Sequence, residues 1–465
     1  MSKFWAKRRG AILLVLLLVV TLPLTVGLVQ KAVQLLTGAS FRPAAIVVDA
    51  SQLNGPFPMV WAGLSQGHEK KDLRLDTVTQ QVKNVGVKYV RIDHVLDGFG
   101  VVERTDGRLV YDYTRLDLLV SDILAMGATP YFAISYMPSA ISRGDVVDLP
   151  NDWGEWGQVT ANLVGHYSRD FRGGITNIIY EVWNEPDLFG GWKLYGEKSY
   201  TQLYSVASRA AQGVSGAKPF KIGGPATTGF YPAWVDGFYS KLDSQVRIDF
   251  FSWHRYSVRV DDFVKDAENA ASMIAPQITR AQDLYISEWG VNPERGSQYD
   301  GRWAAAHYLA VVRALSDTAV DLALAFEIQD GDQADEQFHG GWGMLTNSKY
   351  GPIAKKPRFR AMELVSRLKG ERVSLAGEGD FVTAFGAVDS NGVLRVLAVN
   401  YDERGKHSEV FPLTISGLND ATYEVTEEYL SGRVVRNTIT GSGGILRRDI
   451  AVGASEAVLL TVSAK

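Results

Sequence analysis

The chain has 465 residues, of which 46% are hydrophobic and 22% are charged. This composition is typical of a globular protein and excludes a disordered or collagen-like chain. The absence of cysteine excludes disulfide scaffolds, cysteine-ligated metal centres and thiol nucleophiles. Because 48 Lys and Arg residues stand against 52 Asp and Glu residues, the charge balance also argues against a nucleic-acid partner.

The N-terminus has the pattern of a membrane segment. Residues 11–29 carry no charged side chain, and a helix of that length, at ~1.5 Å per residue, spans about one hydrocarbon layer. The basic cluster before it (Lys3, Lys7, Arg8 and Arg9) should stay in the cytoplasm. We therefore expect residues 1–40 to anchor the protein in the cell membrane, with the rest of the chain on the periplasmic or extracellular side. The alternative is a signal peptide cleaved near residues 37–39, which would release a secreted protein.

Apolar runs and amphipathic helical patterns alternate between residues 41 and 370. The runs have few charges, as strands buried on both faces should, and they cover 58–64, 88–93, 129–135, 178–184, 220–224, 248–254, 283–288 and 321–328. Helical periodicity covers 72–85, 112–126, 155–170, 197–214, 262–280, 302–316 and 356–369. In the fifth unit Pro232 restricts the helix to a late start. The pattern predicts an α/β fold, a (β/α)8 TIM barrel; a doubly wound sheet is the alternative.

Residues 371–465 have a different character. Alternating runs at 381–388, 393–401, 422–430 and 457–463 are separated by turn signals such as the one at 389–392. They predict a C-terminal all-β sandwich domain. We expect the apolar run 44–50, before the barrel, to add a strand to it.

Two predicted strands end in a glutamate within a polar and aromatic setting. The fourth ends at Glu185 and the seventh at Glu288. Reactive residues of a barrel lie where its strands run into the following loops, so the two side chains should face each other across the mouth. Two carboxylates in different environments are what cleavage of a glycosidic bond needs, one as the proton donor and one ionised. We expect the short separation of a retaining pair, about 5–5.5 Å.

Nearby residues could assist this pair. Asn184 can bind a sugar hydroxyl. His254 and Tyr256 lie at the end of the sixth strand, and Tyr256 could donate to Glu288 and keep it ionised. Arg91 could do the same through its charge, or it could pair with Glu181 instead. Of the tryptophans near this face (Trp192, Trp253, Trp289 and Trp342), we expect Trp289 to be a platform for a sugar ring.

These motifs resemble a known group of enzymes. Trp183-Asn184-Glu185-Pro186 resembles the acid/base motif of the clan A retaining glycoside hydrolases, and Ser287-Glu288-Trp289-Gly290 resembles the nucleophile motif of that clan. The stretch 180–187 and His254-Arg255-Tyr256 are most similar to glycoside hydrolase family 39. That family includes β-xylosidases, α-iduronidases and membrane-tethered endoglycosidases from bacterial exopolysaccharide gene clusters.

The resemblance implies a barrel with a β-sandwich, in which Glu185 is the acid/base and Glu288 the nucleophile. One departure is the end of the eighth strand at 326–330, which lacks the tryptophan that is common there. Because the chain has no H-E-x-x-H, P-loop or G-x-G-x-x-G motif, we expect no metal or cofactor.

The sequence therefore predicts an exported, membrane-anchored retaining glycoside hydrolase that acts on an extracellular or periplasmic polysaccharide. Cleavage within the polysaccharide chain fits a membrane anchor, but the sequence leaves the choice between internal and terminal cleavage open. A transglycosylase would use the same residues, and a non-catalytic polysaccharide-binding or assembly protein would keep the barrel without turnover. A serine-hydrolase interpretation rests on Gly63-Leu64-Ser65-Gln66-Gly67, which matches G-x-S-x-G. It is disfavoured because only one predicted strand precedes the motif.

Overall fold

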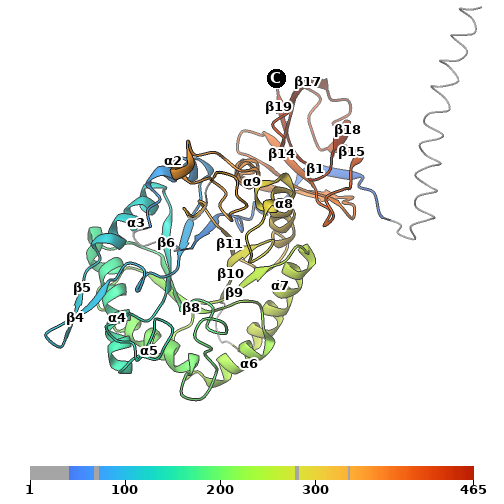
Figure 1. Ribbon diagram of the computed structural model, residues 1–465. Helices are drawn as coiled ribbons and strands as arrows, with labels where there is room; N and C mark the ends of the chain where they lie inside the picture. The colour runs from blue at the N-terminus through green and yellow to red at the C-terminus, as the bar shows by residue number, and fades with distance from the viewer. Residues whose placement is uncertain (1–40, 68–72, 278–281, 333–335) are drawn as a thin grey trace, which may run out of the picture.

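A computed structural model describes residues 41–67, 73–277, 282–332 and 336–465 (Figure 1). The segment 1–40, for which we predict a membrane anchor or a signal peptide, lies outside the described residues. None of the helices within the described ranges combines the length and the apolar character needed to cross a bilayer.

Eight parallel strands close into a barrel in the order β10-β11-β2-β3-β6-β7-β8-β9. Strands that follow each other in the chain are neighbours, and β11 returns to pair with β2, so the predicted TIM barrel is confirmed and an open doubly wound sheet is excluded. The first strand begins later than expected because residues 60 and 61 form a turn. The strands are β2 (Gly63–Gln66), β3 (Tyr89–Ile92), β6 (Thr129–Ile134), β7 (Ile178–Val182), β8 (Phe220–Thr227), β9 (Phe250–Tyr256), β10 (Asp283–Gly290) and β11 (Leu322–Phe326).

Helices surround the barrel and bury their apolar faces against it (Figure 1). Side-chain caps start two of them, since Asp152 accepts from the N–H of Gly154 and Ser199 from that of Gln202. The fifth-unit helix begins at Pro232, as predicted. The helices are α2 (Thr79–Val85), α3 (Thr114–Ala125), α4 (Trp153–Gly165), α5 (Tyr200–Gln212), α6 (Pro232–Lys241), α7 (Val260–Ile274), α8 (Arg302–Leu315) and α9 (Pro357–Val365).

One hairpin was not predicted. Strands β4 (Val102–Thr105) and β5 (Arg108–Tyr111) pair between β3 and α3 and project away from the barrel (Figure 1). They are joined by Asp106 and Gly107, which both have positive φ. An Asp-Gly pair favours this type of two-residue turn, so the signal was present in the sequence.

The remaining strands form one nine-stranded sheet in the order β17-β16-β19-β14-β13-β12-β1-β15-β18. Buried side chains from both ends of this order share a single core, so the sheet folds over on itself. The expected extra strand is β1 (Ile46–Pro56), between β12 and β15; this segment, which we placed in the barrel domain 41–370, therefore belongs to the β-domain. The other strands are β12 (Glu371–Ala376), β13 (Val382–Val388), β14 (Leu394–Asn400), β15 (Glu409–Ser416), β16 (Thr422–Tyr429), β17 (Val434–Thr440), β18 (Leu446–Val452) and β19 (Ala457–Ala464).

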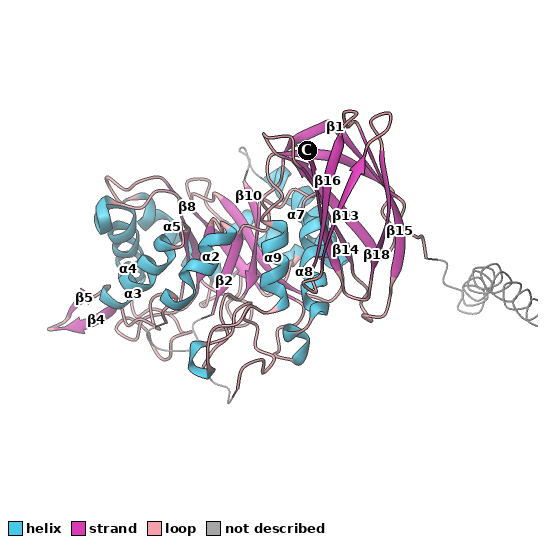
Figure 2. Cartoon of the chain, turned by 90° about the horizontal axis from the view of Figure 1, so that it is seen from above, coloured by secondary structure: helices cyan, strands magenta, loops and turns pink. Residues whose placement is uncertain are grey.

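The β-domain lies against the α8 and α9 side of the barrel (Figure 2). The indole of Trp303 in α8 donates to the backbone oxygen of Asp402 at 3.1 Å. The hydroxyl of Tyr401 donates to the backbone oxygen of Val258, in the loop that follows β9, at 2.6 Å. The β-domain thus supports one helix and one loop of the barrel.

Candidate active site

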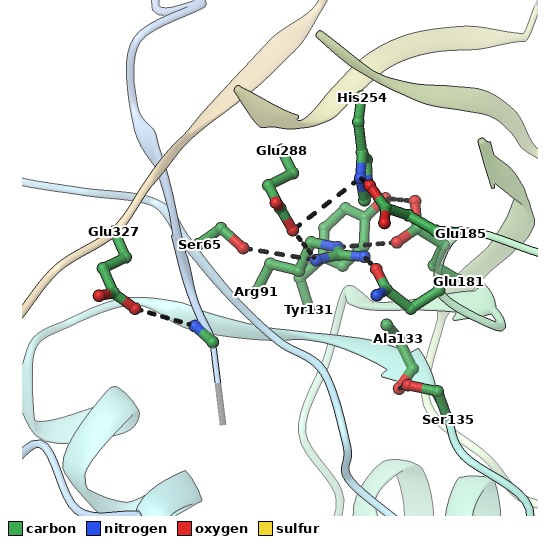
Figure 3. A network of polar contacts seen from close by, with 12 residues as sticks. Ser65, Arg91, Tyr131, Ala133, Ser135, Glu181, Glu185, His254, Glu288 and Glu327 are labelled. Carbon is green, nitrogen blue, oxygen red and sulfur yellow. Dashed lines mark hydrogen bonds and ion pairs between the residues drawn. The ribbon is translucent and has the colours of Figure 1, made fainter. Parts of the chain in front are cut away.

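A sharp turn at the end of β7 places Glu185. Trp183 and Glu185 both have positive φ, 74° and 49°, a conformation that costs energy for residues with a side chain and is concentrated at functional sites. The N–H of Glu185 donates to the backbone oxygen of Ala226, next to it in β8, at 3.0 Å. The turn aims the Glu185 side chain at the groups above the barrel core (Figure 3).

Glu288 reaches the same place from β10. The pairing of β10 with β9 shifts its register between Ile286 and Glu288, so that Glu288 lies opposite His254. Such an irregularity re-aims a side chain at the rim of a barrel. The carboxylate is largely buried, with 12% of the side chain exposed.

The two carboxylates meet at His254. Its Nδ1 lies 2.8 Å from Oε1 of Glu185 and 3.9 Å from Oε2 of Glu288. This nitrogen and one oxygen from each carboxylate all lie within 4.8 Å of one another. The two carboxylates are therefore closer than the ~6.5 Å at which a water molecule fits between an inverting pair and its sugar.

Glu288 is held by a hydroxyl and a guanidinium. Tyr256 donates to its Oε1 at 2.6 Å, and Nη1 of Arg91 lies 3.3 Å from its Oε2. Arg91 also donates to Glu181 at 2.8 Å and to Oδ1 of Asn184 at 2.6 Å. The two interactions that the sequence offered as alternatives for Arg91 are thus made together (Figure 3).

Burial controls the protonation of Glu288. It raises the pKa of this carboxyl, and the nearby charge of Glu185 adds to the effect, whereas His254, Arg91 and Tyr256 oppose it. The net direction is upward, and Arg91 and Tyr256 act in the expected direction, since both favour the ionised carboxylate. For His254, burial lowers the pKa, but the charge of Glu288 and the hydrogen bond with Glu185 raise it more. The imidazole therefore holds a proton readily between the two carboxylates.

Glu181 and Tyr131 complete the charge balance beneath the site. Burial raises the pKa of Glu181, but Arg91 and His254 lower it more, so Glu181 stays ionised. Tyr131 donates to its Oε1 at 2.8 Å. A glutamate inside a strand that is otherwise apolar was the signal for Glu181; the sequence offered none for Tyr131.

Asn184 is oriented from both ends. Its Oδ1 accepts from Arg91, and its Nδ2 donates to the hydroxyl of Tyr136 at 2.9 Å. Tyr136, in the loop after β6, was missed by sequence analysis. The amide is therefore fixed one residue before Glu185.

Trp289 was predicted to bind a sugar, and the structure corrects this. The side chain is 1% exposed, and its ring stacks on Tyr308 of α8 at 5.4 Å between centroids. Side chains alternate between the two faces of a strand, so a Glu288 that faces the mouth turns Trp289 toward the helices. Trp192 and Trp253 are buried as well. Trp342 is only partly buried and lies near Phe326, with ring centroids 5.6 Å apart.

A third carboxylate lies beside the mouth at the end of β11. Glu327 is 1% exposed and accepts from Nε2 of Gln66 at 2.7 Å and from the N–H of Gly67 at 3.3 Å (Figure 3). Sequence analysis did not single it out as a site residue. Ser65, in the G-x-S-x-G match, accepts from Nη1 of Arg91 at 3.4 Å. An arginine cannot take the proton of a serine, which argues against the serine-hydrolase interpretation.

In the described part of the chain, the two carboxylates and the imidazole of the site are also the groups that could hold a metal ion. Glu185, His254 and Glu288 offer ligand atoms within 4.8 Å of one another. Nδ1 of His254, however, is already hydrogen-bonded to Glu185, and Arg91 lies next to Glu288. Since cationic partners stand where an ion would bind, we assign no metal to this site.

Comparison with known proteins decides the family. The family model described as "Glycosyl hydrolases family 39" matches residues 45–425. The chain belongs to glycosyl hydrolase family 39. The enzyme is therefore a glycoside hydrolase, and the resemblance found in the motifs is confirmed.

Curated relatives and solved structures agree with this assignment. The β-xylosidase of Caldicellulosiruptor saccharolyticus is 27% identical over 72% of this chain and 73% of its own length. The β-xylosidase of Geobacillus stearothermophilus is 25% identical over 65% of this chain and 66% of its own length. Among solved structures, the GH39 enzyme of Xanthomonas axonopodis pv. citri superposes with a TM-score of 0.77 at 20% identity, covering 92% of this chain and 99% of the other. A monomeric β-xylosidase from Caulobacter crescentus CB15 gives 0.75 at 22% identity, covering 90% and 99%; both structures are alike in fold.

Proposed function

We propose that the enzyme is a retaining glycosidase in which Glu288 is the nucleophile and Glu185 the acid/base. The observation that carries this proposal is the approach of the two carboxylates, whose oxygens lie within 4.8 Å of each other and of His254. At that separation Glu288 attacks the sugar directly, because no water fits between them.

The reaction then has two steps. In the first, an oxygen of Glu288 attacks the anomeric carbon while Glu185 gives its proton to the leaving oxygen, which forms a covalent glycosyl-enzyme. In the second, Glu185 takes a proton from water, and the resulting hydroxide displaces Glu288. His254 holds the Glu185 carboxyl, while Tyr256 and Arg91 stabilise the carboxylate of Glu288.

Asn184 would bind the sugar next to the reacting carbon. Its amide is held by Arg91 and Tyr136, so little rotational freedom is lost when a sugar hydroxyl binds. Such a contact strengthens in the transition state as charge develops on the sugar.

The substrate that we propose is a polysaccharide outside the cytoplasm. Two supports are the uncharged stretch 11–29 after a basic cluster and the membership in family 39. Because two relatives are named β-xylosidases, β-xylosides are the first compounds to test, followed by a panel of defined polysaccharides with analysis of product masses.

Glu185→Gln tests the acid/base. The amide has nearly the same shape but gives no proton, so hydrolysis of glycosides with poor leaving groups should fall by about 10²- to 10⁴-fold. Aryl glycosides with good leaving groups should lose far less in the first step. Glu197→Gln, at a side chain that is 79% exposed, is the matched control. An equal loss on both classes of substrate would refute the assignment.

Glu288 is tested by trapping. A 2-fluoro sugar with a good leaving group should label Glu288 covalently, as peptide mass spectrometry would show, and NMR should show a first product with the anomeric configuration of the substrate. A label on another residue, or an inverted product, would overturn the proposal.

The location is tested separately. Membranes washed with high salt should retain the full chain, whereas a chain without residues 1–40 should be soluble and active. A mature N-terminus near Ser40 in native material would replace the anchor by a cleaved signal peptide.

A further inference from the structure

Large apolar side chains are exposed on the loops that follow β7 and β8, and three of them lie on, or are linked by hydrogen bonds to, the turn that carries Glu185. Leu188 and Phe189, which are 60% and 41% exposed, come three and four residues after Glu185. Tyr231, which is 42% exposed, precedes α6. Strands β7 and β8 are neighbours in the barrel, and exposed apolar groups on adjacent loops are candidates for a binding surface. These three residues are called the β7–β8 platform below.

The first part of the platform is built on the same turn as Glu185. The backbone N–H groups of Leu188 and Phe189 both donate to the backbone oxygen of Glu185, at 3.0 and 2.7 Å. The indole of Trp183 donates to the backbone oxygen of Phe189 at 3.1 Å. The Phe189 ring meets that of Tyr136 at 5.7 Å, and Tyr136 in turn holds Asn184. Both exposed side chains therefore have a fixed position relative to the carboxyl of Glu185.

Tyr231 is tied to this turn through hydrogen bonds. Its hydroxyl lies 2.8 Å from Oγ1 of Thr228. Thr228 binds Asp187, through its hydroxyl at 2.5 Å and its backbone N–H at 3.1 Å, and Asp187 lies between Glu185 and Leu188. A Cβ on Gly229 would come within 3.3 Å of the Tyr231 ring, so the ring lies close over the backbone there. The exposed ring is thus held in place before any ligand binds.

We propose that the β7–β8 platform binds the sugar residues on the leaving-group side of a polymeric substrate, an inference that rests on the acid/base role of Glu185 proposed above. The residue that protonates the leaving oxygen lies beside the leaving sugar, so the next sugar units of the polysaccharide pass over the turn that follows Glu185. The C–H faces of sugar rings are apolar and pack on aromatic rings. Rings that are already ordered lose little entropy when they bind. A platform on this side serves cleavage within a chain, since an enzyme that accepts any small leaving group has no need of it.

The test compares two substrates of one sugar, a four-unit oligosaccharide and the glycosyl fluoride, beginning with xylotetraose and xylosyl fluoride. Fluoride leaves as a single atom and cannot touch the platform. In Phe189→Ala and Tyr231→Ala, kcat/KM on the tetrasaccharide should fall by about tenfold or more, while kcat/KM on the fluoride stays within about twofold of the wild-type value. Tyr231→Phe keeps the ring and should resemble the wild type. Leu188→Ala should likewise lower kcat/KM on the tetrasaccharide more than on the fluoride, and Leu118→Ala, at a 47% exposed leucine of α3, is its matched control.

Each other outcome overturns the inference in a distinct way. Equal losses of kcat/KM on both substrates would show that the substitutions disturb Glu185. An unchanged kcat/KM on both substrates would show that the oligosaccharide does not contact these residues. A wild-type enzyme that hydrolyses the fluoride but no oligosaccharide would refute the platform and leave the proposed chemistry standing. Hydrolysis of neither, across all sugars tried, would refute the proposed function as well. A change of mass in solution, measured by light scattering on Leu188→Ala, would show that the patch joins two copies of the chain.

Discussion

Tyr256→Phe isolates the hydrogen bond that we expect to matter most to the nucleophile. The phenol donates to Oε1 of Glu288 at 2.6 Å inside a buried site, and a hydrogen bond to a charged group contributes about 1.5–3 kcal/mol. This bond opposes the burial that raises the pKa of Glu288. Its removal therefore raises that pKa further, and a larger share of Glu288 is protonated at a given acidic pH.

The assay is kcat/KM on one glycoside across the pH range. Nucleophilic attack needs the ionised carboxylate, so activity falls as the pH drops through the pKa of Glu288, and in Tyr256→Phe this acidic limb should begin at higher pH. At 1.4 kcal/mol per tenfold, the stated energy predicts a loss of about 10- to 150-fold on the acidic side and a smaller loss on the alkaline side. Tyr200→Phe, which removes a buried hydroxyl that donates to the backbone oxygen of Val182 at 2.8 Å, is the control for lost stability. A loss that is uniform with pH would refute the reasoning.

Three further predictions concern stability. Arg91→Met leaves the fully buried charge of Glu181 without its guanidinium and should lower the free energy of unfolding by about 3–5 kcal/mol in urea titrations; a loss below 1 kcal/mol would contradict this. Burial, aided by the charge of Arg358, lowers the pKa of His307 to about 3. The unfolded chain therefore binds a proton that the folded chain rejects, and stability should fall by up to about 5 kcal/mol as the pH drops from 6.5 toward 3; His307→Gln should remove that part of the slope, and an unchanged slope would count against it. Trp289→Leu should lower the melting temperature without a selective rise in KM, because the ring packs in the core. A raised KM at an unchanged melting temperature would instead support the expectation from the sequence that Trp289 binds a sugar ring.

Much of the fold could be predicted because its signals are local. The strands of a barrel are buried on both faces and stand out as uncharged runs, and Pro232 marks the start of α6. The apolar run 44–50 was expected to join the β-domain, but its neighbours in the sheet could not be predicted. Strand β1 pairs with β12 and β15, more than 300 residues later in the chain, and no local pattern records which strands become neighbours.

The candidate site divides in the same way. Glu185 and Glu288 could be selected because each lies near the end of a buried strand, and strands four and seven of a closed ring point into one mouth. Trp289 was misplaced, although the alternation of side chains along β10 already puts it on the opposite face from Glu288. Tyr131 and Tyr136 gave no signal, because a tyrosine in an apolar run has the same pattern whether its hydroxyl packs in a core or binds a carboxylate.

The sequence by itself determined the type of fold and the kinds of groups available for chemistry, since periodicity, charge and residue type are properties of short stretches. Tertiary structure alone decided the distances and the protonation. The register shift in β10 sets Glu288 opposite His254, the turn after β7 brings Glu185 to the same nitrogen, and burial raises the pKa of Glu288 against three neighbouring donors. Electrostatic and hydrogen-bond energies depend on separation and on exclusion of water, and both quantities exist only once the eight strands have closed.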